Sequence, residues 1–149
     1  MNCDQHLVAA HPFGTLITAE TLLEQFNCLS QWEARYRQLI LLAKQLPPLA
    51  ENLRQPALEL SGCESRVWFG YQLLADGRLH FYADSDSRIV RGLLAVLLTA
   101  IEGKSAQQLL PIDPLALFDQ LALRGPLSTT RAGGLAALAQ RVQEIAAQQ

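Results

Sequence analysis

The sequence predicts an α+β fold in which a small antiparallel sheet is packed on one side by several helices. Two observations support this prediction. Residues 66–84 hold two runs of β-forming residues around Asp76-Gly77, which is a strong hairpin signal. Most of the remaining chain instead spaces its apolar residues at a helical period. Because half of the 149 residues are hydrophobic, the chain can bury a core without disulfides or a metal.

Residues 1–17 are predicted to form an irregular N-terminal lead-in, since Pro12 and Gly14 interrupt any regular pattern. Residues 18–149 are predicted to form a single domain, because no linker, internal repeat or low-complexity segment divides them. Thr18 is placed to cap the first helix of this domain, which we expect to end near Gln25.

A second helix is predicted to begin at Ser30, which can form a capping box with Glu33, and to end at Gln45 before Pro47-Pro48. Residues 49–54 can add one or two further helical turns. The buried face of the second helix is predicted from apolar residues at helical spacing, namely Trp32, Tyr36, Leu39, Ile40, Ala43 and Leu46.

Two strands are predicted over residues 66–74 and 79–83. Asp76-Gly77 between them favours a type I′ turn, which needs positive φ at both central residues. Because two strands alone are marginally stable, we expect a third strand, for which residues 57–60 are the best candidate.

The C-terminal half follows a helical pattern. Asp84, Ser85 or Asp86 can cap a helix over about residues 87–102, which Gly103 ends. This helix is apolar on nearly all sides, so we expect it to be the buried central helix. Three further helical segments are predicted. The first follows Ser105 and ends near residue 110, the second follows Asp113 and ends near residue 121, and the last follows Ser128 and ends near residue 147.

Composition and charge exclude several classes of function. The net charge of −2 provides no basic field for nucleic acid or an anionic membrane. The most apolar stretch, residues 92–101, has about half the length that a membrane span needs. The N-terminus does not resemble a signal peptide, so we expect a cytoplasmic location. The three cysteines are too widely spaced for a zinc site, and we expect no metal and no cofactor.

Cys63 is the candidate reactive residue. It lies in a polar, glycine-containing link directly before a strong strand, where a loop can present its sulfur. Arg66 would favour the thiolate form, whereas Glu64 would oppose it. These residues alone fit both a nucleophilic cysteine and an inert one. Cys3 and Cys28 are expected to be incidental.

Arg131 is the second candidate, because it lies in the first turn of the final predicted helix, where the helix dipole disfavours cations. Gly133-Gly134 follow it and would let another segment approach closely. The residues fit either a functional site or a frayed, solvated helix start. The histidines are scattered along the sequence, and His80 is expected to be a surface or packing residue rather than a base.

Four blocks together carry a resemblance to a known family. They are residues 32–47, residues 62–68 around Cys63, residues 84–95, and residues 127–135 around Arg131. Their order and spacing resemble the SufE/CsdE family of sulfur acceptors. His11-Pro12-Phe13-Gly14 makes the chain most similar to the CsdE branch of that family.

The resemblance implies a fold like that of the IscU-type iron–sulfur scaffolds. It also implies that Cys63 receives persulfide sulfur from a cysteine desulfurase of the CsdA/SufS type, stimulates that enzyme, and passes the sulfur on. The final acceptor would be either an iron–sulfur scaffold or a tRNA-modifying enzyme. Arg131 matches a family arginine near the acceptor cysteine, where it would contact an anion or a partner.

The chain would then be an accessory sulfur-transfer protein rather than an enzyme. It would need no pyridoxal phosphate of its own, and a monomer and a dimer are both compatible with it. Two other classes of function stay open at this point: a self-sufficient cysteine hydrolase or peroxidase, and a non-catalytic interaction module that uses the helical surface.

Overall fold

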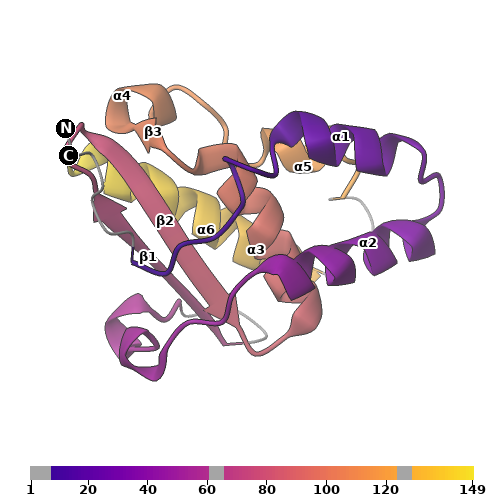
Figure 1. The fold of residues 1–149 in the computed structure, drawn as a ribbon, viewed down its shortest axis with the longest axis horizontal. Helices are drawn as coiled ribbons and strands as arrows, with labels where there is room; N and C mark the ends of the chain where they lie inside the picture. The colour runs from indigo at the N-terminus through magenta and orange to yellow at the C-terminus, as the bar shows by residue number, and fades with distance from the viewer. Residues whose placement is uncertain (1–7, 61–65, 124–128) are drawn as a thin grey trace.

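In the part of the chain that the computed structural model describes, a three-stranded antiparallel sheet and six α-helices form a mixed α+β fold, as the sequence predicts (Figure 1). The structure describes residues 8–60, 66–123 and 129–149. In chain order the elements are α1 Ala19–Asn27, α2 Trp32–Gln45, the 3-10 turns η1 Glu51–Leu53 and η2 Pro56–Leu58, β1 Val67–Leu73, β2 Arg78–Ser85, α3 Arg88–Ile101, β3 Lys104–Ser105, α4 Ala106–Leu109, α5 Ala116–Gln120 and α6 Thr129–Ala147.

The sheet has the strand order β1-β2-β3 and is antiparallel throughout. In the β1–β2 hairpin Val67 lies opposite Ser85, and Leu73 lies opposite Leu79. The two-residue strand β3 pairs with the start of β2, where Lys104 faces Leu79. As a result β2 is the central strand, and all of its residues after Arg78 are buried.

The sheet buries both of its faces, but in different ways. On one face Phe69, Phe81 and their neighbours pack into the main core around α3. Successive strand residues point to opposite faces, so the other face carries the alternate residues. There Trp68 and Tyr82 form a smaller apolar cluster with Leu49, covered by the segments before α1 and after α2. The polar side chains of His80 and Asp84 are buried on this second face as well.

Helix α3 is the buried centre of the molecule, as predicted, and Figure 1 shows it between the sheet and helices α1 and α2. Its packing against α2 depends on Gly92, because a Cβ atom there would collide with the backbone carbonyl of Leu39. The two helices therefore approach more closely than any larger residue at position 92 allows. Within the described residues, none of the helices is both long and apolar enough to cross a bilayer.

The predicted third strand is wrong in position. Within residues 57–60, Glu59 makes only an isolated bridge to Trp68, and the preceding residues form η2. The third strand is β3, on the opposite edge of the sheet. The predicted type I′ turn is also wrong, because only Gly77 has positive φ there. A longer turn with one left-handed glycine connects β1 and β2.

Several predicted helix caps differ from the observed ones. The predicted capping box of Ser30 is absent, since α2 begins after Gln31, whose side chain makes no cap bond. Helix α3 is capped by Ser87, whose hydroxyl accepts from the Val90 amide, and not by Asp84, Ser85 or Asp86. Thr18 does cap α1 and Ser105 does cap α4.

Two further boundaries differ or fall outside the description. Helix α5 begins at Ala116, two residues later than predicted, because Asp113 accepts from the Leu115 amide in a turn before it. The predicted cap Ser128 lies outside the described residues.

Gly92→Ala should lower the free energy of unfolding by about 1–3 kcal/mol, the usual cost of overpacking a core. Gly133→Ala is the matched control, since Gly133 lies in α6 with open space around its Cα. This control should raise the free energy of unfolding by about 0.5–1 kcal/mol. Urea denaturation of both variants measures the difference, and equal effects would contradict the close α2–α3 contact.

Candidate functional site

The residues on either side of residues 61–65, the segment that contains the predicted acceptor Cys63, are anchored to the sheet. The segment itself lies outside the described residues. On its N-terminal side the Leu60 amide donates to the Val67 carbonyl at 2.9 Å. Glu59 forms an antiparallel bridge with Trp68. These contacts fix the chain where it leaves the sheet edge.

Arg66 anchors the other end through both its backbone and its side chain. Its amide donates to Asp86 Oδ1 at 3.1 Å, and its carbonyl accepts from the Ser85 hydroxyl at 2.6 Å. Its guanidinium donates from Nε to Glu59 Oε2 at 3.1 Å and from Nη2 to Glu59 Oε1 at 3.0 Å. This bidentate pair joins Glu59, two positions before residue 61, to Arg66, the residue directly after residue 65.

Trp68 lies at the centre of this base. The guanidinium carbons of Arg66 and Arg54 lie 4.9 and 5.1 Å from the centroid of its ring, within cation–π range. The indole is 97% buried, as its 3% exposure shows. Its Nε1–H has no hydrogen-bond partner among the residues that the structure describes.

Asp84, at the end of β2, is a fully buried carboxylate that gathers three segments. Its Oδ2 accepts from the Leu49 amide at 2.9 Å and from Arg54 Nη2 at 2.8 Å. Its Oδ1 accepts from Arg91 of α3, whose guanidinium also donates to the Leu46 carbonyl at the end of α2. Asp84 therefore ties the end of β2 to α2 and α3.

His11, His80 and Glu102 form a second buried cluster, which their separation in the sequence conceals. His80 Nδ1 donates to Glu102 Oε2 at 2.6 Å, and His80 Nε2 donates to the Val8 carbonyl at 2.6 Å. Glu102 Oε1 also accepts from the Phe81 amide at 2.8 Å. Both ring nitrogens of His80 face oxygen atoms, an arrangement that stabilises the protonated ring. His80 is therefore a buried packing residue rather than a surface residue, and both of its ring nitrogens are used in structural hydrogen bonds.

The ligand atoms of this cluster lie within 4.8 Å of one another, close enough to hold a metal ion. The hydrogen bonds of His11 oppose that use. The Phe13 amide donates to His11 Nδ1 at 3.2 Å, so the ring proton sits on Nε2, which donates to the Phe81 carbonyl at 2.7 Å. Nε2 of His11, the nitrogen that would bind a metal, therefore carries a proton in this arrangement. The hydrogen bonds favour a buried ion pair over a metal site.

The electrostatics of the cluster favour an ion pair. Burial by itself lowers the pKa of His80, but the hydrogen bond and charge of Glu102, with nearby carbonyls, raise the pKa overall. Burial by itself raises the pKa of Glu102, but hydrogen bonds from His11, His80 and the Phe81 amide lower it overall. The pair ties residue 8 to the second face of the sheet.

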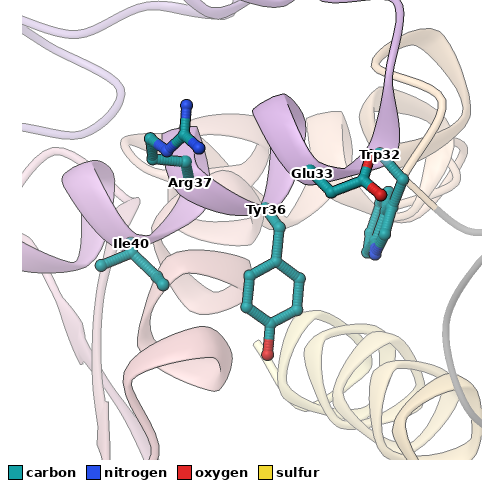
Figure 2. A pocket seen from close by; sticks show the side chains of 5 residues that line it. All are labelled: Trp32, Glu33, Tyr36, Arg37 and Ile40. Atoms are coloured by element: carbon teal, nitrogen blue, oxygen red, sulfur yellow. The ribbon is translucent and has the colours of Figure 1, made fainter.

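Helix α2 carries a surface hollow of about 390 Å³, lined by Trp32, Glu33, Tyr36, Arg37 and Ile40. Figure 2 shows the Trp32 and Tyr36 rings on the same side of the helix, and they meet edge to face at 5.9 Å. The prediction places both rings on the buried face of α2, but they are only half-buried and pack against the edge of the main core. The buried residues of the helix are Leu39, Leu42 and Ala43. The lining residues include no thiol and no imidazole, so the hollow offers contact area rather than a nucleophile or a base.

The remaining predicted site residues are only partly described. Arg131 lies in the first turn of α6, as predicted, and its side chain lies outside the described part of the structure. Cys3 also lies outside it. Cys28 is an exposed free thiol at the end of α1.

Comparison with known proteins identifies the family. The family model of SufE, described as "Fe-S metabolism associated domain", matches residues 20–146 of the chain. The chain belongs to the SufE family. This finding confirms the resemblance that the four sequence blocks carry.

Within the SufE family, the chain is 58% identical over 134 residues to the sulfur acceptor protein CsdE of Escherichia coli K12. That match covers 90% of this chain and 91% of the relative. Uncharacterized SufE-like proteins of Rhizobium etli and Rhizobium meliloti are 36% and 35% identical, each over 88% of this chain, and 90% and 96% of their own lengths are covered. The chain is thus a CsdE-like member of the SufE family.

Removing the charge of Asp84 should destabilise the protein strongly. Asp84→Asn leaves Arg91, whose side chain is only 17% exposed, without its buried counter-ion. Breaking one partner of a buried pair costs about 3–5 kcal/mol, so we expect a loss of that size in the free energy of unfolding. Arg54→Gln removes a more exposed partner and should cost less than about 1 kcal/mol. Chemical denaturation compares the two, and similar losses would contradict the central role of Asp84.

The His80–Glu102 pair should make stability depend on pH in a defined window. Because the pKa of His80 is raised, its contribution is complete below about pH 6.5 and is lost as pH rises through the folded-state pKa. Because the pKa of Glu102 is lowered, its contribution is complete above about pH 4.3 and is lost as pH falls through the folded-state pKa.

Glu102→Gln should therefore destabilise most between about pH 4.3 and 6.5. NMR titration of the His80 ring should give a midpoint above about 6.5 in the wild type and a lower one in the variant. A wild-type midpoint below that value would show that the pair does not form.

Proposed function

We propose that the chain accepts sulfur on Cys63 from the persulfide of a cysteine desulfurase, stimulates that enzyme by removing its sulfur, and passes the sulfur to a downstream acceptor protein. Membership of the SufE family and the similarity to a protein named as a sulfur acceptor support this proposal. The downstream acceptor is either an iron–sulfur scaffold or a tRNA-modifying enzyme. In this role the chain is an accessory protein that acts in the cytoplasm, where thiols stay reduced.

The proposed step is thiol–persulfide exchange. The Cys63 thiolate attacks the terminal sulfur of the donor cysteine persulfide, and a new S–S bond forms on Cys63. The S–S bond within the donor breaks at the same time, and the donor sulfur leaves as a thiolate. The proton of the persulfide moves with its sulfur or exchanges with water, so no oxidant, reductant or cofactor of this chain is consumed.

The observation that best supports Cys63 is the anchored base on either side of it. Leu60 is hydrogen-bonded to Val67 of β1. Arg66 is hydrogen-bonded to Ser85 at the end of β2 and to Asp86 directly after it. Cys63 is three positions along the chain from each anchor, and three Cα–Cα steps span at most about 11 Å. A rigid base that carries a short link is suited to offering one side chain to a partner's pocket.

Arg131 is proposed to contact the thiolate, the persulfide anion or an acidic group of the desulfurase. The guanidinium of Arg66 is already paired with Glu59, so its charge is largely neutralised at the base of the link. A second cation is therefore the better candidate for an anion at Cys63.

A self-sufficient cysteine hydrolase or peroxidase has less support. Such an enzyme needs a base that can reach its thiol. His11 and His80, the histidines within the described residues, both use their ring nitrogens in hydrogen bonds to other groups. Neither is available to act as the base.

Incubation with a cysteine desulfurase and free cysteine should add the mass of one sulfur atom to the wild-type chain, and peptide mapping should place it on Cys63. Cys63→Ser should gain no such adduct. Cys28→Ser is the matched control, because Cys28 is an exposed thiol at the end of α1, outside the segment that carries Cys63. This variant should be persulfidated like the wild type. An adduct of equal size on Cys63→Ser would reject the proposal.

A further inference from the structure

We propose that Glu59 and Arg66 are positioning residues whose bidentate ion pair closes the base of residues 61–65 and sets the direction from which Cys63 meets the donor persulfide. This inference rests on the proposed function of Cys63. It assigns a role to two side chains that the exchange chemistry itself does not use.

The geometry of the pair is specific. Two guanidinium nitrogens of Arg66 donate to the two oxygens of one carboxylate, at 3.1 and 3.0 Å. Parallel bonds of this kind fix orientation as well as distance, and only arginine can form them. The Trp68 ring lies under the same guanidinium and limits its movement from one side.

The position of the pair matters more than its strength. The two side chains are 61% and 30% exposed, and exposed ion pairs contribute little to folding stability. This pair nevertheless joins Glu59, which bridges β1 just before residues 61–65, to Arg66, the first residue after them. Because Glu59 bridges Trp68 while Arg66 is held by Asp86, the pair braces two chain ends that the backbone already brings together. Its expected effect is on the presentation of Cys63, and not on the fold.

Charge offers a competing explanation, and the structure allows the two to be separated. The hydrogen bond and charge of Arg66 lower the pKa of Glu59, so the carboxylate is ionised and offsets the cation. Glu59→Gln breaks the bidentate geometry but releases the positive charge of Arg66. Arg66→Gln breaks the same geometry but removes that charge. A positioning role predicts the same direction of change in both variants, whereas a purely electrostatic role predicts opposite directions.

The test measures single-turnover transfer of sulfur from a desulfurase persulfide to Cys63, together with the pH profile of Cys63 alkylation by iodoacetamide. We expect both variants to lower the transfer rate by about tenfold or more, since a displacement of about 1 Å can cost about a hundredfold. Alkylation by the small reagent should change little in rate, because it needs no docking. The apparent pKa of the Cys63 thiol, read from this pH profile, should move in opposite directions in Glu59→Gln and Arg66→Gln.

Arg78→Gln is the matched control. Arg78 forms an exposed ion pair with Asp76, at 2.7 Å, at the other end of the same hairpin. Its transfer rate should equal that of the wild type. The double variant Glu59→Gln/Arg66→Gln should be no slower than either single variant, because both remove one shared interaction.

Different results reject different statements. Transfer rates that change in opposite directions, that stay at the wild-type value, or that fall equally in Arg78→Gln would overturn the positioning role. A wild-type chain that gains no sulfur on Cys63 would instead reject the proposed function, and the positioning role with it. Urea denaturation should show equal stability for all variants, and a loss of stability that tracks the loss of transfer would also overturn the inference.

Discussion

The buried carboxylate of Asp84 holds together the elements on which the candidate site depends. It accepts from two arginines and two backbone amides, so each of its oxygens is satisfied by charge and by hydrogen bonds. Burying a charge is unfavourable unless such partners are present. This requirement fixes the end of α2, the start of α3 and the end of β2 relative to one another. The next residues, Ser85 and Asp86, then hold Arg66.

The second face of the sheet therefore has a different character from the first. The first face is an apolar core around α3, which gives the fold its stability. The second face presents Trp68, His80 and Asp84, and each of them fastens an irregular segment to the sheet. Ion pairs and hydrogen bonds define positions more sharply than apolar contacts do. The polar contacts of Ser85 and Asp86, directly after Asp84, hold Arg66 beside the segment that carries the candidate chemistry.

The sequence predicts much of this fold because many of its signals are local. The hairpin, the central helix α3, and the caps Thr18 and Ser105 depend on residues close together in the chain, and all are confirmed. The third strand was missed because β3 has only two residues and no repeating pattern. Its neighbour Ala106 starts a helix at once.

The clusters of the second face could not be predicted for a different reason. Asp84 offers the right side chain for a helix cap, but Arg54 and Arg91 compete for it, and only the tertiary fold brings Arg54 close. His80 meets Glu102 across 22 residues of sequence. Cys63 and Arg131 were predicted from a resemblance to a family, and their roles stay predictions.

The different environments of the two tryptophans make intrinsic fluorescence a probe of two separate regions of the protein. Trp68 is enclosed among apolar side chains with guanidinium groups against its ring, whereas Trp32 is half-buried in the hollow on α2. An enclosed indole emits at shorter wavelength than a hydrated one, so the two contributions differ in colour. Rearrangement around Arg66 and occupancy of the α2 hollow would thus change separate parts of the intrinsic fluorescence, without any added dye.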